Sequence, residues 1–117
     1  MKSILVVEDD VAVGETIRSI LEESAYDVCV FAHPTQLPAG SSPALLITDL
    51  ACNGGYCSAD AVQEIQALRV RTPAPILVLT AHSAAQKDEQ LARAANAVLT
   101  KPFEMVDLLA AVERLAV

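Results

Sequence analysis

The chain alternates between short aliphatic runs and longer stretches in which apolar residues recur at helical spacing. Five short runs carry almost only aliphatic side chains between turn-forming residues: 4–7, 28–31, 45–50, 76–79 and 97–99. Continuous apolar runs of this kind are typical of strands buried on both faces of a sheet. The run at 45–50 differs from the others because a carboxylate, Asp49, stands near its end.

Helices are predicted between these runs. Apolar residues three and four positions apart give one buried face to each of the stretches 11–24, 58–70 and 104–115. The stretch 83–95 is predicted to be a weaker helix, because most of its apolar positions are alanine. Segment 32–43 holds three of the six prolines, which break helix interiors, so only a turn of helix around residues 35–37 is expected there.

Strand and helix alternate along the whole chain. This order predicts an α/β fold, with a doubly wound, five-stranded parallel sheet, helices on both faces and right-handed crossovers. No internal repeat or linker divides the sequence, so we expect residues 1–117 to form a single domain.

The composition narrows the function classes. The formal net charge is −7 and the lysines and arginines do not cluster, which argues against direct nucleic-acid binding. No apolar run is long enough to span a membrane, and the N-terminal residues lack the apolar region and cleavage site of a signal peptide. We therefore expect a cytoplasmic protein without a nucleic-acid or membrane partner.

Three cysteines are present, namely Cys29, Cys52 and Cys57. A zinc site would need further ligands, and His33 and His82 do not stand at ligand spacing. An odd number of cysteines in a cytoplasmic protein indicates free, reduced thiols.

Polar residues follow four of the predicted strands. They are Glu8 and Asp9, then Asp49, Thr80 and Lys101. In an open parallel sheet, the carboxyl ends of the strands share one edge, where ligand sites form near the switch in strand order. We therefore expect these five side chains to meet in one cleft, although they lie far apart in the sequence.

The residue types in this group suit phosphoryl transfer. Carboxylates in one pocket repel one another unless a cation joins them, and oxygen ligands suit Mg²⁺, which also takes phosphate oxygens. An aspartate such as Asp49 can attack phosphorus and form an aspartyl-phosphate, while Lys101 and Thr80 can bind the transferred oxygens. Taken singly, each residue has a simpler interpretation as a helix cap, a strand-end hydroxyl or a surface lysine, and either Asp9 or Asp10 can cap the next helix.

The chain resembles the receiver domains of two-component response regulators. The resemblance covers essentially the whole sequence and rests on four motifs in the family's order and approximate spacing. They are Leu5-Val6-Val7-Glu8-Asp9-Asp10, Ile47-Thr48-Asp49-Leu50, Leu79-Thr80-Ala81 and Lys101-Pro102-Phe103. The resemblance implies a flavodoxin-like, chemotaxis-regulator-like fold with sheet order 2-1-3-4-5, in which the second helix of this chain is shortened or missing.

The resemblance also implies a role for three side chains. Asp49 would be the phosphoacceptor, and Thr80 would hydrogen-bond the phosphoryl group. Lys101 would pair with Asp49 and then with the phosphoryl group. The peptide between Lys101 and Pro102 would be cis.

Mg²⁺ is the cofactor that the resemblance implies. Its protein ligands would be Asp9, Asp49 and the backbone carbonyl of Ala51, while Glu8 would act through a water.

The implied function is that of a signalling switch rather than an enzyme, one that assists its own phosphorylation and dephosphorylation. In a Mg²⁺-dependent reaction, it would take a phosphoryl group from a sensor histidine kinase or a phosphotransfer protein. Phosphorylation would then change its affinity for a downstream protein or output domain. The family pattern also suggests a homodimer through the last two helices and the fifth strand.

Several positions depart from the family pattern. Val98 stands three residues before Lys101, where an aromatic residue usually takes part in switching. The loop after Asp49 contains Asn53-Gly54-Gly55 where a proline is common, and His82 stands where side chains tune dephosphorylation. These departures leave a second hypothesis open, a pseudo-receiver that binds partners without phosphorylation. A hydrolytic enzyme is disfavoured, because the chain has no Gly-x-Ser-x-Gly motif and no P-loop.

Overall fold

Five parallel strands form one sheet in the computed structural model, which describes residues 2–38, 40, 42–50 and 55–116. The strands lie in the order β2-β1-β3-β4-β5. Their bounds are β1 (Ser3–Val7), β2 (Asp27–Phe31), β3 (Leu45–Asp49), β4 (Ile76–Thr80) and β5 (Ala97–Thr100). The predicted parallel sheet and its strand order are confirmed.

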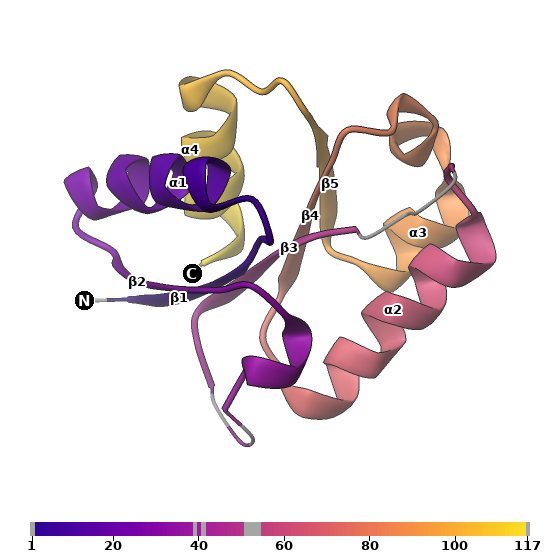
Figure 1. Ribbon diagram of the computed structural model, residues 1–117, viewed down its shortest axis with the longest axis horizontal. Helices are drawn as coiled ribbons and strands as arrows, with labels where there is room; N and C mark the ends of the chain where they lie inside the picture. The colour runs from indigo at the N-terminus through magenta and orange to yellow at the C-terminus, as the bar shows by residue number, and fades with distance from the viewer. Residues whose placement is uncertain (1, 39, 41, 51–54, 117) are drawn as a thin grey trace.

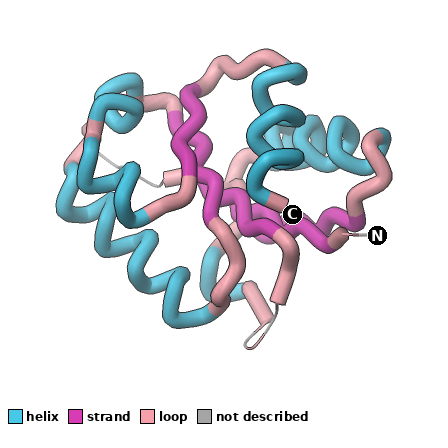
Figure 2. The backbone as a smooth tube through the Cα atoms, turned by 180° about the vertical axis from the view of Figure 1, so that it is seen from behind, coloured by secondary structure: helices cyan, strands magenta, loops and turns pink. Residues whose placement is uncertain are grey.

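Helices cover both faces of this sheet (Figure 1). The helices α1 (Val11–Glu23) and α4 (Met105–Leu115) pack on one face, and α2 (Ser58–Arg71) and α3 (Glu89–Ala94) pack on the other. Seen from behind, the strands run between the two helical layers (Figure 2). None of the described helices is both long and apolar enough to cross a membrane.

The carboxyl ends of the strands lie along one edge because the strands pair nearly in register. Val7 of β1 pairs with Phe31 of β2 and with Thr48 of β3. At the same edge, Thr80 of β4 pairs with Thr100 of β5. The chain leaves β1 toward α1 and leaves β3 toward α2, on the opposite face, so the connections diverge between these two strands, where ligand sites form in such sheets.

In the described part of the proline-rich segment after β2, one short 3₁₀ helix is present, η1 (Pro34–Gln36). The side chain of Gln36 accepts hydrogen bonds from the backbone N–H groups of Ala32 (2.9 Å) and His33 (3.2 Å), which closes the turn. Leu37 is buried after it, and Arg71 at the end of α2 donates to its carbonyl at 2.8 Å. The expected shortened second helix is thus confirmed, about one residue earlier than predicted.

The helix predicted over residues 83–95 is divided in two. A 3₁₀ helix, η2 (Ser83–Lys87), comes first, and α3 begins after Asp88. The carboxylate of Asp88 accepts from the N–H groups of Gln90 (3.0 Å) and Leu91 (3.3 Å), so it starts a new helix. The alanine-rich stretch buries only Ala85, Leu91 and Ala95, which is too little apolar surface to hold one continuous helix on the sheet.

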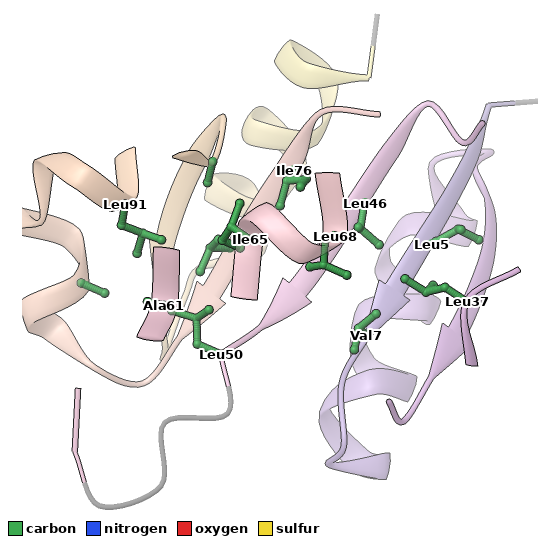
Figure 3. Close-up of a cluster of buried hydrophobic side chains, with 13 residues drawn as sticks. Leu5, Val7, Leu37, Leu46, Leu50, Ala61, Ile65, Leu68, Ile76 and Leu91 are labelled. Carbon is green, nitrogen blue, oxygen red and sulfur yellow. The ribbon is translucent and has the colours of Figure 1, made fainter. Parts of the chain in front are cut away.

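The sheet separates two hydrophobic clusters. On one face, Ile17 and Leu21 of α1 pack with Leu108 and Val112 of α4 over the strands. The cluster on the other face is drawn in Figure 3 and includes Leu5, Val7, Leu37, Leu46, Leu50, Ala61, Ile65, Leu68, Ile76 and Leu91. Each fully buried leucine or isoleucine contributes about 1.5–3 kcal/mol relative to an exposed one, so these two aliphatic clusters hold the strand ends in place.

The two acids after Glu8 have different positions at the start of α1. Asp10 is the N-cap, and its carboxylate accepts from the N–H groups of Ala12 (3.0 Å) and Val13 (3.2 Å). The sequence allowed either Asp9 or Asp10 in that position. Because Asp10 caps the helix, the Asp9 carboxylate is not needed there.

Gly14 allows α1 to approach the sheet closely. A Cβ atom at this position would lie 3.0 Å from Cγ1 of Val30 on β2 and 3.9 Å from the side-chain carbons of Glu8. The missing side chain therefore leaves room for the packing of α1 on β2, while a Cβ would only be in ordinary van der Waals contact with Glu8.

Replacing Gly14 with valine should lower the free energy of unfolding by about 1–3 kcal/mol, because the added carbons overpack the contact with Val30. This loss is expected although valine has the better intrinsic helix propensity. Urea denaturation provides the measurement. The matched control is Ala12→Val, at an exposed position of the same helix, with an expected cost of about 0.5 kcal/mol. Equal losses in the two variants would mean that α1 can move away from β2 at little cost.

Candidate functional site

The site lies at the carboxyl edge of the sheet. Glu8 follows β1, Asp49 is the last residue of β3, and Lys101 follows β5. Glu8 is buried at 4% exposure, which requires a charged or hydrogen-bonding partner for its carboxylate.

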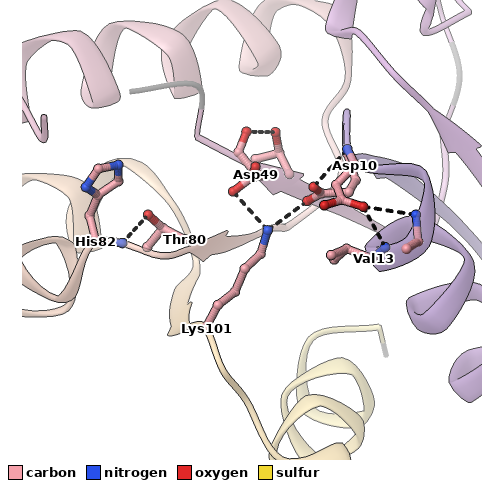
Figure 4. A network of polar contacts seen from close by, with 9 residues as sticks. Asp10, Val13, Asp49, Thr80, His82 and Lys101 are labelled. Carbon is pink, nitrogen blue, oxygen red and sulfur yellow. Dashed lines mark hydrogen bonds and ion pairs between the residues drawn. The ribbon is translucent and has the colours of Figure 1, made fainter. Parts of the chain in front are cut away.

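Lys101 supplies that partner. Its Nζ lies 3.0 Å from Oε2 of Glu8 and 3.4 Å from Oδ1 of Asp49, so one amine contacts two carboxylates (Figure 4). The side chains of Lys101 and Asp49 are only about one-fifth exposed, at 20% and 21%. The convergence of these three groups, which the sequence predicted, is therefore present in the structure.

Asp9 completes an acidic cluster. One carboxylate oxygen from each of Glu8, Asp9 and Asp49 lies within 4.8 Å of the others. Asp9 is exposed, Asp49 is half-buried and Glu8 is buried, so the cluster opens to solvent on the side of Asp9.

The donor set of the cluster fits a hard divalent cation. All three groups are carboxylates, and an octahedral Mg²⁺ site with bonds of about 2.1 Å spans about 4.2 Å between opposite ligands. Both oxygens of Glu8 already have protein partners, since Oε1 accepts from the N–H of Asp10 at 3.2 Å and Oε2 contacts Lys101. Asp9 and Asp49 are therefore better placed for direct ligation. Ala51, whose carbonyl was the other expected ligand, lies outside the described residues.

Burial and mutual repulsion raise the pKa of both inner carboxyl groups. For Asp49, burial has the largest effect, the positive charge of Lys101 opposes it, and the charges of Asp9 and Glu64 raise the pKa further. For Glu8, burial also dominates, with the hydrogen bond from Lys101 opposing it and the charge of Asp49 adding to it. A bound cation would relieve this repulsion.

The pKa of the Lys101 amine lies above its ordinary value. Burial lowers this pKa, but the hydrogen bond to Glu8 and the charges of Asp49 and Glu8 outweigh it. The amine therefore stays protonated at neutral pH and acts as a fixed positive charge beside Asp49.

Thr80 lies at the same edge but does not join the cluster of charges. It falls on the alternating set of β4 that includes Ile76 and Val78, which faces α2. Its side chain is fully buried, and its hydroxyl oxygen accepts from the N–H of His82 at 3.1 Å (Figure 4). The backbone joins it to the site, since its carbonyl accepts from the N–H of Lys101 at 2.7 Å.

Two neighbours of Asp49 were not predicted from the sequence. His33 and Glu64, together with Asp9 and Asp49, line a small pocket of about 60 Å³ at the sheet edge. Glu64 resembles any outward-facing acid of α2, and His33 lies in the irregular segment after β2, so neither carried a sequence signal.

Two further expectations concern backbone and thiols. The peptide between Lys101 and Pro102 is cis, as the resemblance implied. Cys29 and Cys57 are free and exposed, as expected. Cys52 lies outside the described residues.

Comparison with known proteins identifies the family. The family model described as the response regulator receiver domain matches residues 4–113. The chain belongs to this family. A search of curated proteins finds no match. Receiver domains are signalling switches, and the resemblance stated from the four motifs is confirmed.

Solved receiver domains share the fold along their whole length. The response regulator protein TrrA from Thermotoga maritima, in complex with Mg²⁺ and BeF, is 27% identical with a TM-score of 0.76, and the alignment covers 98% of this chain and 99% of that one. The receiver domain of the sensor histidine kinase PA1611 from Pseudomonas aeruginosa, with a magnesium ion in its active-site cleft, is 25% identical with a TM-score of 0.71, covering 98% and 97%. The chemotaxis response regulator CheY4 of Vibrio cholerae shares the fold at 21% identity and a TM-score of 0.71, covering 98% of both chains.

The raised pKa of Asp49 leads to a prediction about stability. A carboxyl whose folded-state pKa is raised contributes stability that is fully present below its unfolded pKa and is lost as the pH rises through the folded pKa. At pH 7, without divalent cations, Asp49→Asn should therefore have a higher free energy of unfolding than the wild type. The gain should disappear as the pH falls below the ordinary pKa of 3.8, where Asp49 becomes protonated in both the folded and the unfolded state.

Urea denaturation in the presence of a chelator, at several pH values, measures this difference. Asp27→Asn removes an exposed aspartate with no such neighbours and should change stability by less than about 0.5 kcal/mol at any pH. A destabilised Asp49→Asn protein at pH 7 would show that the ion pair with Lys101 outweighs burial and repulsion.

Proposed function

We propose that this receiver domain accepts a phosphoryl group on Asp49 in a Mg²⁺-dependent reaction and thereby changes its affinity for a partner. The observation that carries the proposal is the contact of a single half-buried amine, that of Lys101, with both Glu8 and Asp49 inside a cluster of three carboxylates. A structural ion pair needs only one acid. The second and third acids suit a site that binds a cation and a phosphoryl group.

The phosphodonor in this proposal is the phosphohistidine of a sensor histidine kinase or a phosphotransfer protein. A carboxylate oxygen of Asp49 attacks the phosphorus, and a new O–P bond forms while the bond from phosphorus to the imidazole nitrogen breaks. The electron pair of the broken bond stays on that nitrogen. Asp49 suits this role because it is only half-buried, at the end of β3.

The other residues of the site stabilise the transferred group. Lys101 moves its charge from the Asp49 carboxylate to a phosphoryl oxygen, and the Thr80 hydroxyl donates to another. Asp9 and Asp49 would bind Mg²⁺, with Glu8 orienting a bound water. When bound, the cation neutralises charge on the phosphoryl group and lessens the repulsion among the acids.

We place the output of the switch on the face formed by α3, β5 and α4. A hollow on this face is lined by Val98 of β5, Gln86 of η2, and Asp107 and Arg114 of α4. The edge strand β5 forms the floor of this hollow. Thr100, which precedes Lys101 at the end of β5, donates a hydrogen bond from its hydroxyl to the side chain of Gln86 at 3.3 Å. A downstream protein, an output domain or a second copy of the chain would bind there.

Mg²⁺ should bind this protein and stabilise it, by about 2.7 kcal/mol when the free ion is at about 100 times its Kd. Asp9→Asn should weaken the ion's affinity at least tenfold, because a charged ligand becomes neutral. Asp10→Asn is the matched control, since it removes the same charge one residue away and keeps the helix cap. Isothermal titration calorimetry gives both affinities. Equal losses in the two variants would point to general attraction of the cation rather than to ligation by Asp9.

With Mg²⁺ and acetyl phosphate, the wild-type protein should gain the mass of one phosphoryl group. Asp49→Asn should gain none, while Asp60→Asn, an exposed acid in the first turn of α2, should behave as the wild type. Intact-mass spectrometry is the measurement. Absence of the adduct from the wild type would reject the proposal in favour of a pseudo-receiver that binds partners without phosphorylation.

A further inference from the structure

Tyr56 connects two loops that flank the site. It lies in the loop that leads from β3 to α2, and its hydroxyl donates to Oδ2 of Asp88 at 2.5 Å. Asp88 stands between η2 and α3, in the connection that follows β4. The hydrogen bond therefore ties the segment after Asp49 to the segment after Thr80 across 32 positions in the sequence.

The acceptor of this bond is also the residue that starts α3. Oδ1 of Asp88 accepts from the N–H groups of Gln90 and Leu91 while Oδ2 binds Tyr56, so both oxygens are engaged. Hydrogen bonds from the hydroxyls of Ser58 and Tyr56 lower the pKa of Asp88. Because α3 is only six residues long and buries only Leu91 on the sheet, its position depends strongly on this cap.

The other side of Tyr56 faces the loop after β4. The rings of Tyr56 and His82 are 6.1 Å apart with an interplanar angle of 38°, a tilted aromatic contact. The N–H of His82 in turn donates to the hydroxyl of Thr80. A continuous series of contacts thus runs from Thr80 through His82 and Tyr56 to Asp88 and α3.

Position 98 on β5 carries a valine and not an aromatic residue. Val98 is partly buried against the cluster that contains Leu91 and Val78, and it carries no hydrogen-bonding group. Tyr56 is one of only two tyrosines in the chain and has both a ring against His82 and a hydroxyl on Asp88.

We propose that Tyr56 is a positioning residue that couples the state of Thr80 to the start of α3. This inference rests on the proposed function, in which the Thr80 hydroxyl turns to a phosphoryl oxygen on Asp49. Because Thr80 is fully buried, that turn draws its oxygen away from the N–H of His82. The His82 ring then shifts against Tyr56, the bond from Tyr56 to Asp88 rearranges, and the cap of α3 changes.

The first test needs no phosphorylation. Thr80→Val removes the hydroxyl that accepts from His82, and Tyr56→Phe removes the bond to Asp88 while keeping the ring. Backbone amide NMR shifts of Gln90 and Leu91, together with the hydrogen exchange of the Leu91 amide, report on the cap. Each single variant should shift both amides and speed the exchange of Leu91 about fivefold, and the double variant should match Tyr56→Phe alone, because the two changes act in series. Additive effects in the double variant would overturn the proposal.

The second test adds Mg²⁺ and beryllium fluoride to the same proteins. In the wild type, the amides of His82, Gln90 and Leu91 should all shift. In Tyr56→Phe, the His82 amide should still shift, while the responses of Gln90 and Leu91 should fall at least threefold, and the acetyl phosphate adduct on Asp49 should still form. Tyr26→Phe is the control. It alters the second tyrosine of the chain, which packs against the cluster on the other face of the sheet, and it should respond as the wild type.

Full responses of Gln90 and Leu91 in Tyr56→Phe would show that the coupling bypasses Tyr56. Loss of the adduct in the wild type would reject the proposed function, while the double-variant comparison would still decide whether Thr80 and the α3 cap are coupled through Tyr56.

Discussion

The burial of one carboxylate next to a second one is the constraint on which this structure depends. Glu8 leaves β1 into the interior, where its charge would be costly without a partner. Lys101 is 93 positions away in the sequence and follows β5, the edge strand of the sheet, yet its Nζ lies 3.0 Å from the Glu8 carboxylate. Because the same amine also contacts Asp49, β1, β3 and β5 must all end at one edge, which the parallel register of the sheet ensures.

In this arrangement, the negative charges of the site outnumber its positive charges. One amine faces the carboxylates of Glu8, Asp9 and Asp49, and burial raises the pKa of the two inner acids. A divalent cation would relieve this repulsion, and under the proposed function the amine would contact an incoming phosphoryl oxygen. Because Asp10 caps α1, the carboxylate of Asp9 is not needed as the helix cap, and Gly14 lets the same helix pack closely on Val30 of β2.

The part of the same edge around Thr80, at the end of β4, is uncharged and less firmly packed. Thr80 is neutral and fully buried, and it bonds to the backbone of His82 rather than to the charges. Beyond it, the cover of the sheet is weak, since η2 and α3 are short and bury few side chains. The part of the edge that holds the charged groups therefore adjoins a part with few buried side chains, where hydrogen bonds such as the one from Tyr56 to Asp88 position the short helices. This contrast suits a switch, because small changes at Thr80 act on the least firmly packed part of the fold.

The sequence alone determined the strands, most helices and which charged residues meet at one edge of the sheet. Aliphatic runs such as 45–50 and the alternation of strand and helix require a parallel sheet, and strand direction then brings Glu8, Asp49 and Lys101 to one edge. Only the tertiary structure decided which acid caps α1, where the predicted helix 83–95 divides, and that the Thr80 hydroxyl accepts from the backbone of His82. It also placed Glu64, His33 and Tyr56 near the site. Hydrophobic periodicity reports which face of an element is buried, but these outcomes depend on distances between side chains that lie far apart along the chain and meet only once the sheet has formed.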